Sequence, residues 1–348
     1  MAGPTIGRNS RSPRPRRRSW VWLAAAVLAA APVAAGSVFR AIQIAWPRPV
    51  VQLLSFTPWL VIPAALGVAC AALSRRAWLF ATTASLLALQ LFWLFPLGHA
   101  RPAQAADSRR TELKVMNINA QLGQADAAEI VRLVRDNGVG LLAVEEYTSD
   151  LADRLAAEGL ASLLPNRISR PAGRASGAAV YSLHPVRLTG AVPDSQFLMP
   201  MVRLDLNSAG DSASDAAGQT AVEVTVVHAK PPVDAGVAQW RQDLAALGKV
   251  AARPGNVVLI GDFNATYDHA EFRRLLTGAG GRPTVDVGVA AGSRLIPTWP
   301  MDGLPLPGIV IDHILTNPEI TGGSYSVHQV PGTDHAAILA TLSIPVGR

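Results

Sequence analysis

The chain has 348 residues, of which 49% are hydrophobic, 31 are basic and 25 are acidic. This length allows one large domain and a smaller second part. All ten basic residues of the first hundred are Arg, and this stretch has no Asp or Glu, so residues 101–348 carry 21 basic and 25 acidic residues. The overall charge of +6 therefore does not indicate a basic nucleic-acid-binding domain, although a local basic patch stays possible.

The first hundred residues predict a membrane anchor. Residues 1–19 form a basic leader, and residues 20–98 contain three apolar segments at 20–38, 50–73 and 77–97. Each has the roughly 20 apolar residues that cross the hydrocarbon of a bilayer. The Arg-rich start and the small residues of AAAPVAAGS also fit a cleaved signal peptide. Two further apolar segments favour a retained anchor of three transmembrane helices.

The distribution of Arg predicts the orientation of this anchor. The leader has six Arg and the turn at residues 74–76 has two, while the link at residues 39–48 has two. Basic loops tend to stay in the cytoplasm, so we expect residues after Gly98 to lie outside a plasma membrane that the chain crosses several times. Cys70, the only cysteine, lies in the second segment. The C-terminal domain therefore has no disulfide to stabilise it.

Residues 99–110 read as a polar linker, and residues 111–348 as one domain. A strand at 113–119 is followed by a helix from Asp126 to Asn137-Gly138, with Glu129 completing a capping box, and by a strand within VGLLAVEE. Further strands are predicted at 177–182, 201–206, 222–228, 256–260, 310–315 and 337–344, and helices at 237–252 and 268–276. The second of these helices has its own capping box, Asp268 with Glu271, and residues 207–221 form a low-complexity loop. The pattern predicts an α+β sandwich covered by a few helices, because a doubly wound parallel sheet would need more of them.

Polar residues follow or interrupt several of these apolar strands. They are Asn117 and Asn119, Glu145 and Glu146, His228, Asp262 and Asn264, Asp312 and His313, and Asp334 and His335. Each alone is explained by a strand end that meets water or by turn chemistry. Together, the oxygen ligands suit Mg²⁺ or Mn²⁺, and a His with an orienting Asp suits phosphoester hydrolysis. An amide such as Asn264 would hold a water or a phosphate oxygen without adding charge.

The order of these motifs resembles the endonuclease/exonuclease/phosphatase superfamily. GDFNA at residues 261–265 and TDH at 333–335 carry the resemblance, which covers about residues 111–345. It implies a DNase I-like four-layer α/β sandwich, with two sheets flanked by helices and a divalent cation at one mouth. It also implies a metal-dependent phosphoesterase.

The resemblance assigns roles residue by residue. It implies metal ligands at Asn119, Glu146 and Asp334, with Asn117 as a second choice for the amide. It implies catalytic roles for His228, Asp262, Asn264, Asp312 and His335, with Asp312 orienting His335, and it leaves open whether Asp262 or His335 is the base. The chain departs from the family at Glu145, which adds an acid beside Glu146, and at Gln121, which replaces an acid of some nucleases. Both departures leave the number of metal ions open.

The anchor, with the stretch from SRLIPTWP to VIDHIL, is similar to a smaller branch, the actinobacterial membrane proteins related to the VanJ-type teicoplanin-resistance protein. That similarity implies an undecaprenyl-linked phosphate or pyrophosphate substrate at the outer face, where a tethered enzyme meets lipids at high effective concentration.

Residues 295–309, with Trp299 and Met301, either rest on the lipid or form a packed Pro-rich loop. Alternatives are an exported nuclease, a phospholipase or sphingomyelinase-like enzyme, and a non-catalytic tethered binding protein. The expected partners are the bilayer and its lipid-linked phosphates, and the oligomeric state stays open.

Overall fold

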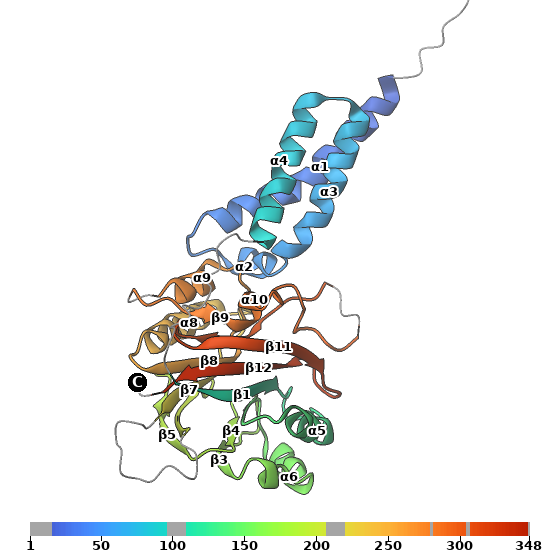
Figure 1. The fold of residues 1–348 in the computed structure, drawn as a ribbon. Helices are drawn as coiled ribbons and strands as arrows, with labels where there is room; N and C mark the ends of the chain where they lie inside the picture. The colour runs from blue at the N-terminus through green and yellow to red at the C-terminus, as the bar shows by residue number, and fades with distance from the viewer. Residues whose placement is uncertain (1–15, 96–108, 207–219, 279–280, 304–306, 347–348) are drawn as a thin grey trace, which may run out of the picture. The chain divides into compact units, whose positions relative to one another are not determined.

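The computed structural model describes residues 16–95, 109–206, 220–278, 281–303 and 307–346 (Figure 1). The chain forms two compact units, one made of Met1–Ile42 and Thr57–Leu97 and the other of Gln43–Phe56 and Gly98–Arg348. Most of the predicted basic leader, linker and low-complexity loop lies outside the described residues. Each unit is taken by itself below.

The first unit consists of helices with apolar surfaces. Its elements are α1 (Arg16–Ala41), η1 (Thr57–Leu60), α3 (Val61–Ser74) and α4 (Ala77–Leu94). Three stretches are long and apolar enough to cross a membrane: Ser19–Ala41, Thr57–Ser74 and Ala77–Leu94. Gln90 Nε2 donates a hydrogen bond of 2.8 Å to Ser37 Oγ inside the unit, so a polar pair is satisfied between two apolar helices. The prediction of three apolar N-terminal helices is confirmed.

The second predicted apolar segment, residues 50–73, is not one helix. Its first residues form α2 (Arg48–Leu54), which starts after Pro47 and ends at Ser55. This helix belongs to the second unit, where Val51 is 1% exposed and packs in the same cluster as Trp240. Hydropathy predicted a longer span because it measures how apolar a residue is and not which partner buries it. The candidate span therefore begins only at Thr57.

The second unit contains two six-stranded sheets. Their orders are β11-β12-β1-β2-β4-β3 and β5-β6-β7-β8-β10-β9. Because β1 and β2 run parallel, as do β7 and β8, while the other neighbours are antiparallel, both sheets are mixed. The strands are β1 (Arg110–Asn119), β2 (Leu141–Glu145), β3 (Asn166–Arg170), β4 (Ala178–Ser182), β5 (Val186–Ala191), β6 (Pro200–Asp205), β7 (Ala221–His228), β8 (Asn256–Asp262), β9 (Val285–Asp286), β10 (Asp312–Thr316), β11 (Thr321–Gln329) and β12 (Ala336–Pro345).

Helices cover the outer face of each sheet, so the unit has four layers (Figure 1). The helices of the first sheet are α5 (Ala127–Asn137), α6 (Ser149–Ala157) and α7 (Leu160–Leu163), and those of the second are α8 (Val237–Ala251) and α9 (Ala270–Thr277), with the short α10 (Val287–Ala290) after β9. The inner faces meet in a core that includes Val115, Val224 and Ile314. The predicted DNase I-like sandwich of two sheets flanked by helices is confirmed.

The eight strands that the sequence predicted are the interior strands, and the four that it missed are the edges β3, β5, β9 and β11. Interior strands are buried on both faces and show apolar runs, whereas an edge strand such as TGGSYSVHQ is mostly half-exposed and has no apolar run.

Asp126 caps α5 as predicted, accepting from Glu129 N at 2.9 Å. The predicted cap at Asp268 is wrong: α9 begins after His269, without a side-chain cap, and Asp268 pairs with Arg294 at 3.2 Å.

We predict that His313→Ala destabilises the second unit. His313 Nδ1 lies 2.8 Å from Asp286 Oδ2, both side chains are buried, and the ring reaches Ala265 O at 2.9 Å through Nε2. Burial opposes a charge on His313, but Asp286 outweighs it and raises the pKa of the ring. Removing the ring leaves a buried carboxylate without its cation, which costs about 3 kcal/mol. Thermal unfolding in detergent should show a fall in Tm of about 6–12 °C. The control His328→Ala removes a half-buried ring on an edge strand, and equal falls in the two variants would contradict the assignment.

Candidate active site

Strand register brings polar residues of the second sheet together at one end. His228 pairs with Asp262 in the parallel ladder of β7 and β8, and Asp262 pairs with Asp312 in the antiparallel ladder of β8 and β10. In the first sheet Asn119 pairs with Glu145, and Glu146 follows directly. Asn119 Nδ2 donates to Asp262 Oδ2 at 3.2 Å, so the two sheets meet at this point. The structure therefore assembles residues that lie far apart in the sequence.

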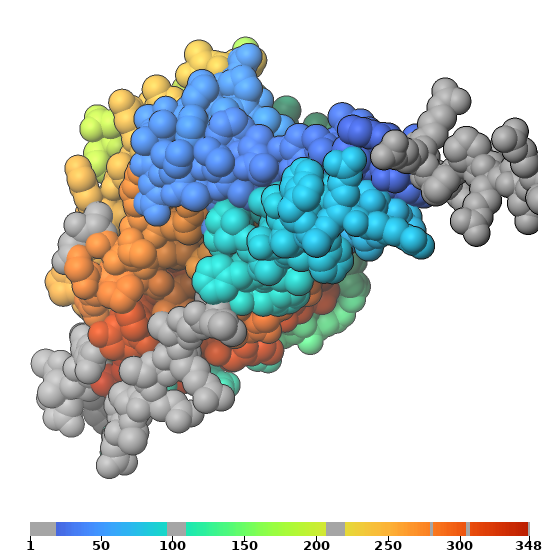
Figure 2. Space-filling view, turned by 90° about the horizontal axis from the view of Figure 1, so that it is seen from above, coloured from blue at the N-terminus to red at the C-terminus, as the bar shows by residue number. Residues whose placement is uncertain are grey.

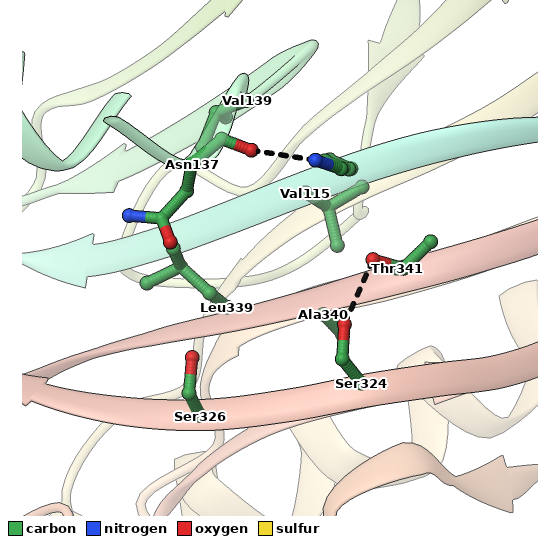
Figure 3. Close-up of a pocket in the computed structure, with 9 residues that line it drawn as sticks. Val115, Asn137, Val139, Ser324, Ser326, Leu339, Ala340 and Thr341 are labelled. Carbon is green, nitrogen blue, oxygen red and sulfur yellow. Dashed lines mark hydrogen bonds between the residues drawn. The ribbon is translucent and has the colours of Figure 1, made fainter. Parts of the chain in front are cut away.

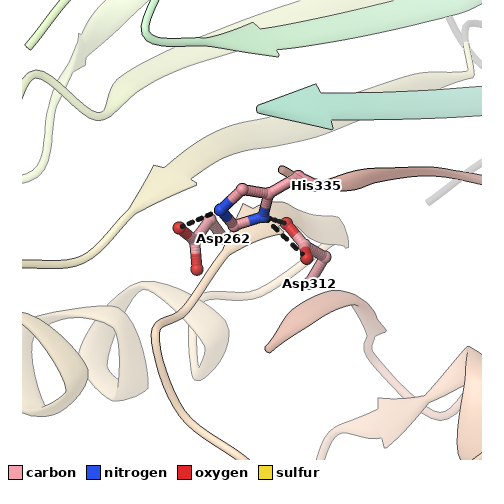
Figure 4. Close-up of side chains that lie close together, drawn as sticks. All are labelled: Asp262, Asp312 and His335. Atoms are coloured by element: carbon pink, nitrogen blue, oxygen red, sulfur yellow. Dashed lines mark hydrogen bonds and ion pairs between the residues drawn. The ribbon is translucent and has the colours of Figure 1, made fainter. Parts of the chain in front are cut away.

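A histidine lies between two buried carboxylates (Figure 4). His335 Nδ1 is 3.1 Å from both oxygens of Asp312, and its Nε2 is 3.9 Å from Asp262 Oδ2. Thr333 Oγ1 accepts from His335 N at 3.1 Å and donates to Asn119 O at 2.7 Å, which fixes the loop that carries the ring. The geometry agrees with the expected role of Asp312 in orienting His335.

The charges of this triad follow from its burial. Burial works against a charged ring, but Asp312, its hydrogen bond and Asp262 outweigh this and raise the pKa of His335 to about 10. Burial raises the pKa of Asp262 to about 7, although the charge of His335 works in the other direction. Ligand atoms of the three residues lie within 4.8 Å of one another, a spacing that could hold a cation. The contacts of His335 with the two carboxylates are also those of an ion-paired triad.

His228 faces the same site in a neutral state. Its Nε2 lies 3.7 Å from Glu146 Oε1 and 3.9 Å from Asp262 Oδ2. Burial, followed by the charge of His335, lowers the pKa of His228 to about 3. The ring stacks on Phe197 with centroids 4.5 Å apart. Phe197 was not predicted, because it lies between strands without any motif. A neutral imidazole held on an aromatic ring can donate or accept one hydrogen bond.

Several site residues have a left-handed backbone. Glu146 has φ 53°, Asn264 has φ 47°, and Gln121 and Leu122 have φ 44° and 56°. Such values are uncommon outside glycine and are often found at functional sites. At Asn264 the conformation lets N donate to Asp262 Oδ1 at 2.7 Å and Nδ2 donate to Asp262 Oδ2 at 3.0 Å. Asn264 therefore fixes the Asp262 carboxylate.

Glu146 and Asn119, two of the predicted metal ligands, lie next to each other. Leu122 N donates to Glu146 Oε2 at 2.8 Å, and Asn119 Nδ2 lies 3.4 Å from Glu146 Oε1. Mg²⁺ and Mn²⁺ prefer carboxylate and amide oxygens, which the Glu146 carboxylate offers. The amide oxygen of Asn119 accepts from Gln121 N at 3.1 Å, and its Nδ2 faces the carboxylates. Asp334, the third predicted ligand, accepts from Trp299 Nε1 at 2.9 Å through Oδ2. Its carboxylate is thus held by a tryptophan rather than by the Glu146 group.

The second acid of the pair is buried under the site. Glu145 is fully buried, and burial together with the charges of Asp312 and Asp262 raises its pKa well above the usual value. The sequence suggested an added negative charge beside Glu146. Burial makes a charge on Glu145 costly, and Glu145 does not line the cavity that Glu146 lines.

These groups line one side of a cavity of about 560 Å³. The polar lining includes Glu146, His228, Asp262, Asn264 and His335. The other lining residues are mostly apolar, and they are Phe56, Ala175, Phe197, Pro231, Pro232, Val233, Trp299, Ile309 and Ile311, together with the polar Gln52 and Ser55. Only the residues of the predicted motifs and Trp299 could be singled out from the sequence.

The Pro-rich stretch at residues 295–309 contributes to this cavity. Trp299 and Ile309 bond to each other through their backbones, with Ile309 N donating to Trp299 O at 2.7 Å. Both side chains line the cavity. Of the two interpretations offered by the sequence, the packed loop therefore fits these two residues, while Leu304 and Leu306 lie outside the described part of the chain.

A second depression lies on the first sheet, between β1, β11 and β12 (Figure 3). Its volume is about 90 Å³, and its lining contains no Asp, Glu or His. Its one charged residue, Lys114, donates to Asn137 O at 2.9 Å. This depression has none of the groups that phosphoester chemistry needs.

Comparisons with known proteins give the family of the chain and solved structures that are similar to it. The model of the endonuclease/exonuclease/phosphatase family matches residues 116–335. Similar solved structures include an endonuclease/exonuclease/phosphatase from Beutenbergia cavernae, at 18% identity and TM-score 0.48, covering 68% of this chain and 72% of that one. D. rerio TDP2 complexed with a single-strand DNA product has 12% identity and TM-score 0.49, covering 67% of this chain and 99% of that one. An AP endonuclease from Archaeoglobus fulgidus has 13% identity and TM-score 0.49, covering 66% and 98%. No match was found among curated protein sequences.

We predict that Glu146 and Asp334 differ in their effect on metal binding. Glu146→Gln should weaken Mn²⁺ binding by about tenfold or more, since it removes one ligand charge and keeps the volume. Asp334→Asn, the matched control, should change it by less than about threefold, because Trp299 already holds one oxygen of that carboxylate. Titration calorimetry on the full-length protein in detergent measures both affinities. An equally large loss in Asp334→Asn would instead support the ligand role that the sequence assigned to it.

Proposed function

Because the chain belongs to the endonuclease/exonuclease/phosphatase family, whose members hydrolyse phosphoesters with a divalent metal, we propose that it is a membrane-anchored phosphoesterase. Its substrate in this proposal is a lipid-linked phosphate or pyrophosphate, of undecaprenyl type, at the outer face of the plasma membrane. One observation carries the proposal. The Asp312–His335–Asp262 triad, His228 and Glu146 meet at a cavity whose remaining wall is mainly apolar.

The residues divide the chemistry between them. Protonated His335, held by Asp312, places positive charge beside the phosphate, where charge develops in the transition state. Asp262 accepts the proton of the attacking water, because its neighbour His335 is already protonated. His228 donates a hydrogen bond through Nε2, and Asn264 holds the Asp262 carboxylate in place. A divalent cation bound by Glu146 and Asn119 would supply Lewis-acid stabilisation of a phosphate oxygen.

Charge and lining favour a lipid over a nucleic acid as substrate. Residues 101–348 have 21 basic and 25 acidic residues, so a duplex would meet no net attraction from this part of the chain. The cavity adds apolar groups such as Val233, Ile309 and Ile311 to the polar cluster. A free nucleic acid offers no hydrocarbon for such a wall. An exported nuclease and a phospholipase-type enzyme stay as outcomes of the tests below.

The packing of residues 43–56 supports the proposed topology. This stretch follows the first candidate span and precedes the second, yet it belongs to the same compact unit as the C-terminal residues. Two further candidate spans, Thr57–Ser74 and Ala77–Leu94, separate the two parts of that unit along the chain. An even number of crossings returns the chain to the same side, as packing within one unit requires. The Arg-rich leader then places that side outside.

We predict that reporters fused after Gly98 are active outside the membrane. An alkaline-phosphatase-type reporter should be active there and a cytoplasmic fluorescent reporter dark, while fusions within residues 74–76 should give the reverse. The reason is the excess of Arg in the leader and in this turn. A fluorescent fusion after Gly98 would contradict the topology.

We also predict that losses at Asp262 and His335 do not add. Asp262→Asn and His335→Ala should each lower turnover by roughly 10²-fold or more, because each removes a positioned acid–base or charged group. The double variant should be little worse than the more impaired single variant, since the two act as a unit. Single-turnover hydrolysis of a lipid pyrophosphate by the detergent-solubilised protein, from pH 5 to 9, measures this.

The control for this experiment is Asn264→Ala, which should lower turnover and move the Asp262 limb of the pH profile to higher pH without abolishing it, because it removes one donor to the Asp262 carboxylate and no titrating group. Near-full activity in Asp262→Asn or His335→Ala would contradict the hydrolase proposal. Activity on DNA with none on lipids would keep the chemistry and replace the substrate.

A further inference from the structure

The stretch Gln43–Phe56 is built into the C-terminal unit by many contacts. Trp46 and Val51 pack in the cluster of α8 and α9. Arg241 Nη2 donates to Trp46 O at 2.5 Å, and Arg274 Nη2 donates to Gln43 O at 2.8 Å. Figure 2 shows the molecule in space-filling form, coloured along the chain from blue to red. The stretch is therefore an integral part of this unit rather than a free link.

A buried histidine fixes α2 at its centre. His269 Nδ1 accepts from Thr266 N at 2.9 Å, so its Nε2 carries the proton and donates to Val51 O at 2.9 Å. Gln52 Nε2 donates to Pro232 O at 3.3 Å, and Pro232 lines the cavity beside Gln52 itself. These contacts set the position of the residues that follow, Ser55 and Phe56. The stretch thus presents a defined surface to the active site.

We propose that Gln43–Phe56 completes the active-site cavity and that Phe56 binds the hydrocarbon chain of an amphiphilic phosphate substrate. Gln52, Ser55 and Phe56 line the same cavity as Glu146 and the catalytic histidines. A phosphate bound at the polar cluster therefore has an apolar wall within the same cavity. This inference deepens the proposed function and rests on it for the reaction, but not for the binding of the chain.

Covalent connectivity indicates what occupies this wall. Phe56 is joined directly to Thr57, the first residue of a candidate membrane span, and Gln43 lies two residues after the end of another. In the proposed topology Phe56 therefore lies at the end of a membrane span, where the tail of an amphiphilic ligand lies. The headgroup would reach the acidic and histidine cluster while the first carbons of the chain contact Phe56. Phe56 is in this case a specificity residue, and it has no role in the chemical step.

Alkylphosphonates of increasing length, from ethyl to octyl, test this proposal on the full-length protein in detergent with Mg²⁺. They are not hydrolysed, so binding is measured whether or not the protein is an active phosphoesterase. In the wild type each methylene that enters the cavity should tighten binding by about threefold to fourfold. Phe56→Ala should weaken octylphosphonate by about tenfold and change ethylphosphonate by less than about twofold. Partition of the ligand into micelles is the same for all variants.

Leu53→Ala is the matched control, because Leu53 lies on α2 three residues before Phe56, is 63% exposed and does not line the cavity. It should leave both affinities unchanged, and Phe56→Leu should restore most of the chain-length dependence if Phe56→Ala folds poorly. Equal losses for both phosphonates, or no loss, would overturn the inference. A loss confined to a short single-stranded DNA would also overturn it and would assign the wall to a nucleobase.

Hydrolysis separates this inference from the proposed function. Chain-dependent binding without hydrolysis of any lipid phosphate would keep the inference and refute the phosphoesterase proposal. Hydrolysis that is independent of chain length and of Phe56 would keep the enzyme and refute the role of Gln43–Phe56.

Discussion

The site depends on one electrostatic constraint: two buried carboxylates, Asp262 and Asp312, face each other across neighbouring strands. Their Cα atoms are partners in the ladder of β8 and β10, and both side chains are almost completely buried. Like charges this close are tolerated only with a cation between them, and His335 takes that place. The loop before β12 must therefore lie across the ends of the second sheet. His335, which directly precedes β12 of the first sheet, therefore completes a site whose two carboxylates lie on β8 and β10 of the second sheet.

Much of this arrangement follows from the sequence, and the part that does not has a physical reason. The interior strands carry apolar runs, and the motif residues stand at their ends, so β7, β8 and β10 and their polar residues were predicted. The edge strand β11 and the stacking partner Phe197 have no such local pattern. Their roles depend on which strand or ring lies opposite, and that is set by contacts between distant residues.

The second predicted membrane segment was placed too early for the same reason, because contacts between distant residues cannot be read from local sequence. Residues 50–54 are apolar, as a membrane helix would be, yet Val51 is buried against a protein core that includes Trp240, far along the chain. A bilayer and a protein interior are equally good environments for such a side chain, so hydropathy cannot distinguish them. The discriminating groups are polar: Arg241 and His269 are placed to bind the backbone carbonyls of Trp46 and Val51.

The stretch that connects two candidate membrane spans therefore also lines the candidate active site. A tether alone would raise the local concentration of lipid substrates and would leave the cavity unchanged. Here Gln43–Phe56 is held by α8 and α9 and also lines the cavity, so its removal would take Trp46 and Val51 out of this cluster and open one wall of the site. A fragment that begins after the anchor would keep the Asp312–His335–Asp262 triad but lose this wall. The stretch Gln43–Phe56, which lies between two candidate membrane spans in the sequence, is thus a structural component of the unit that contains the candidate active site.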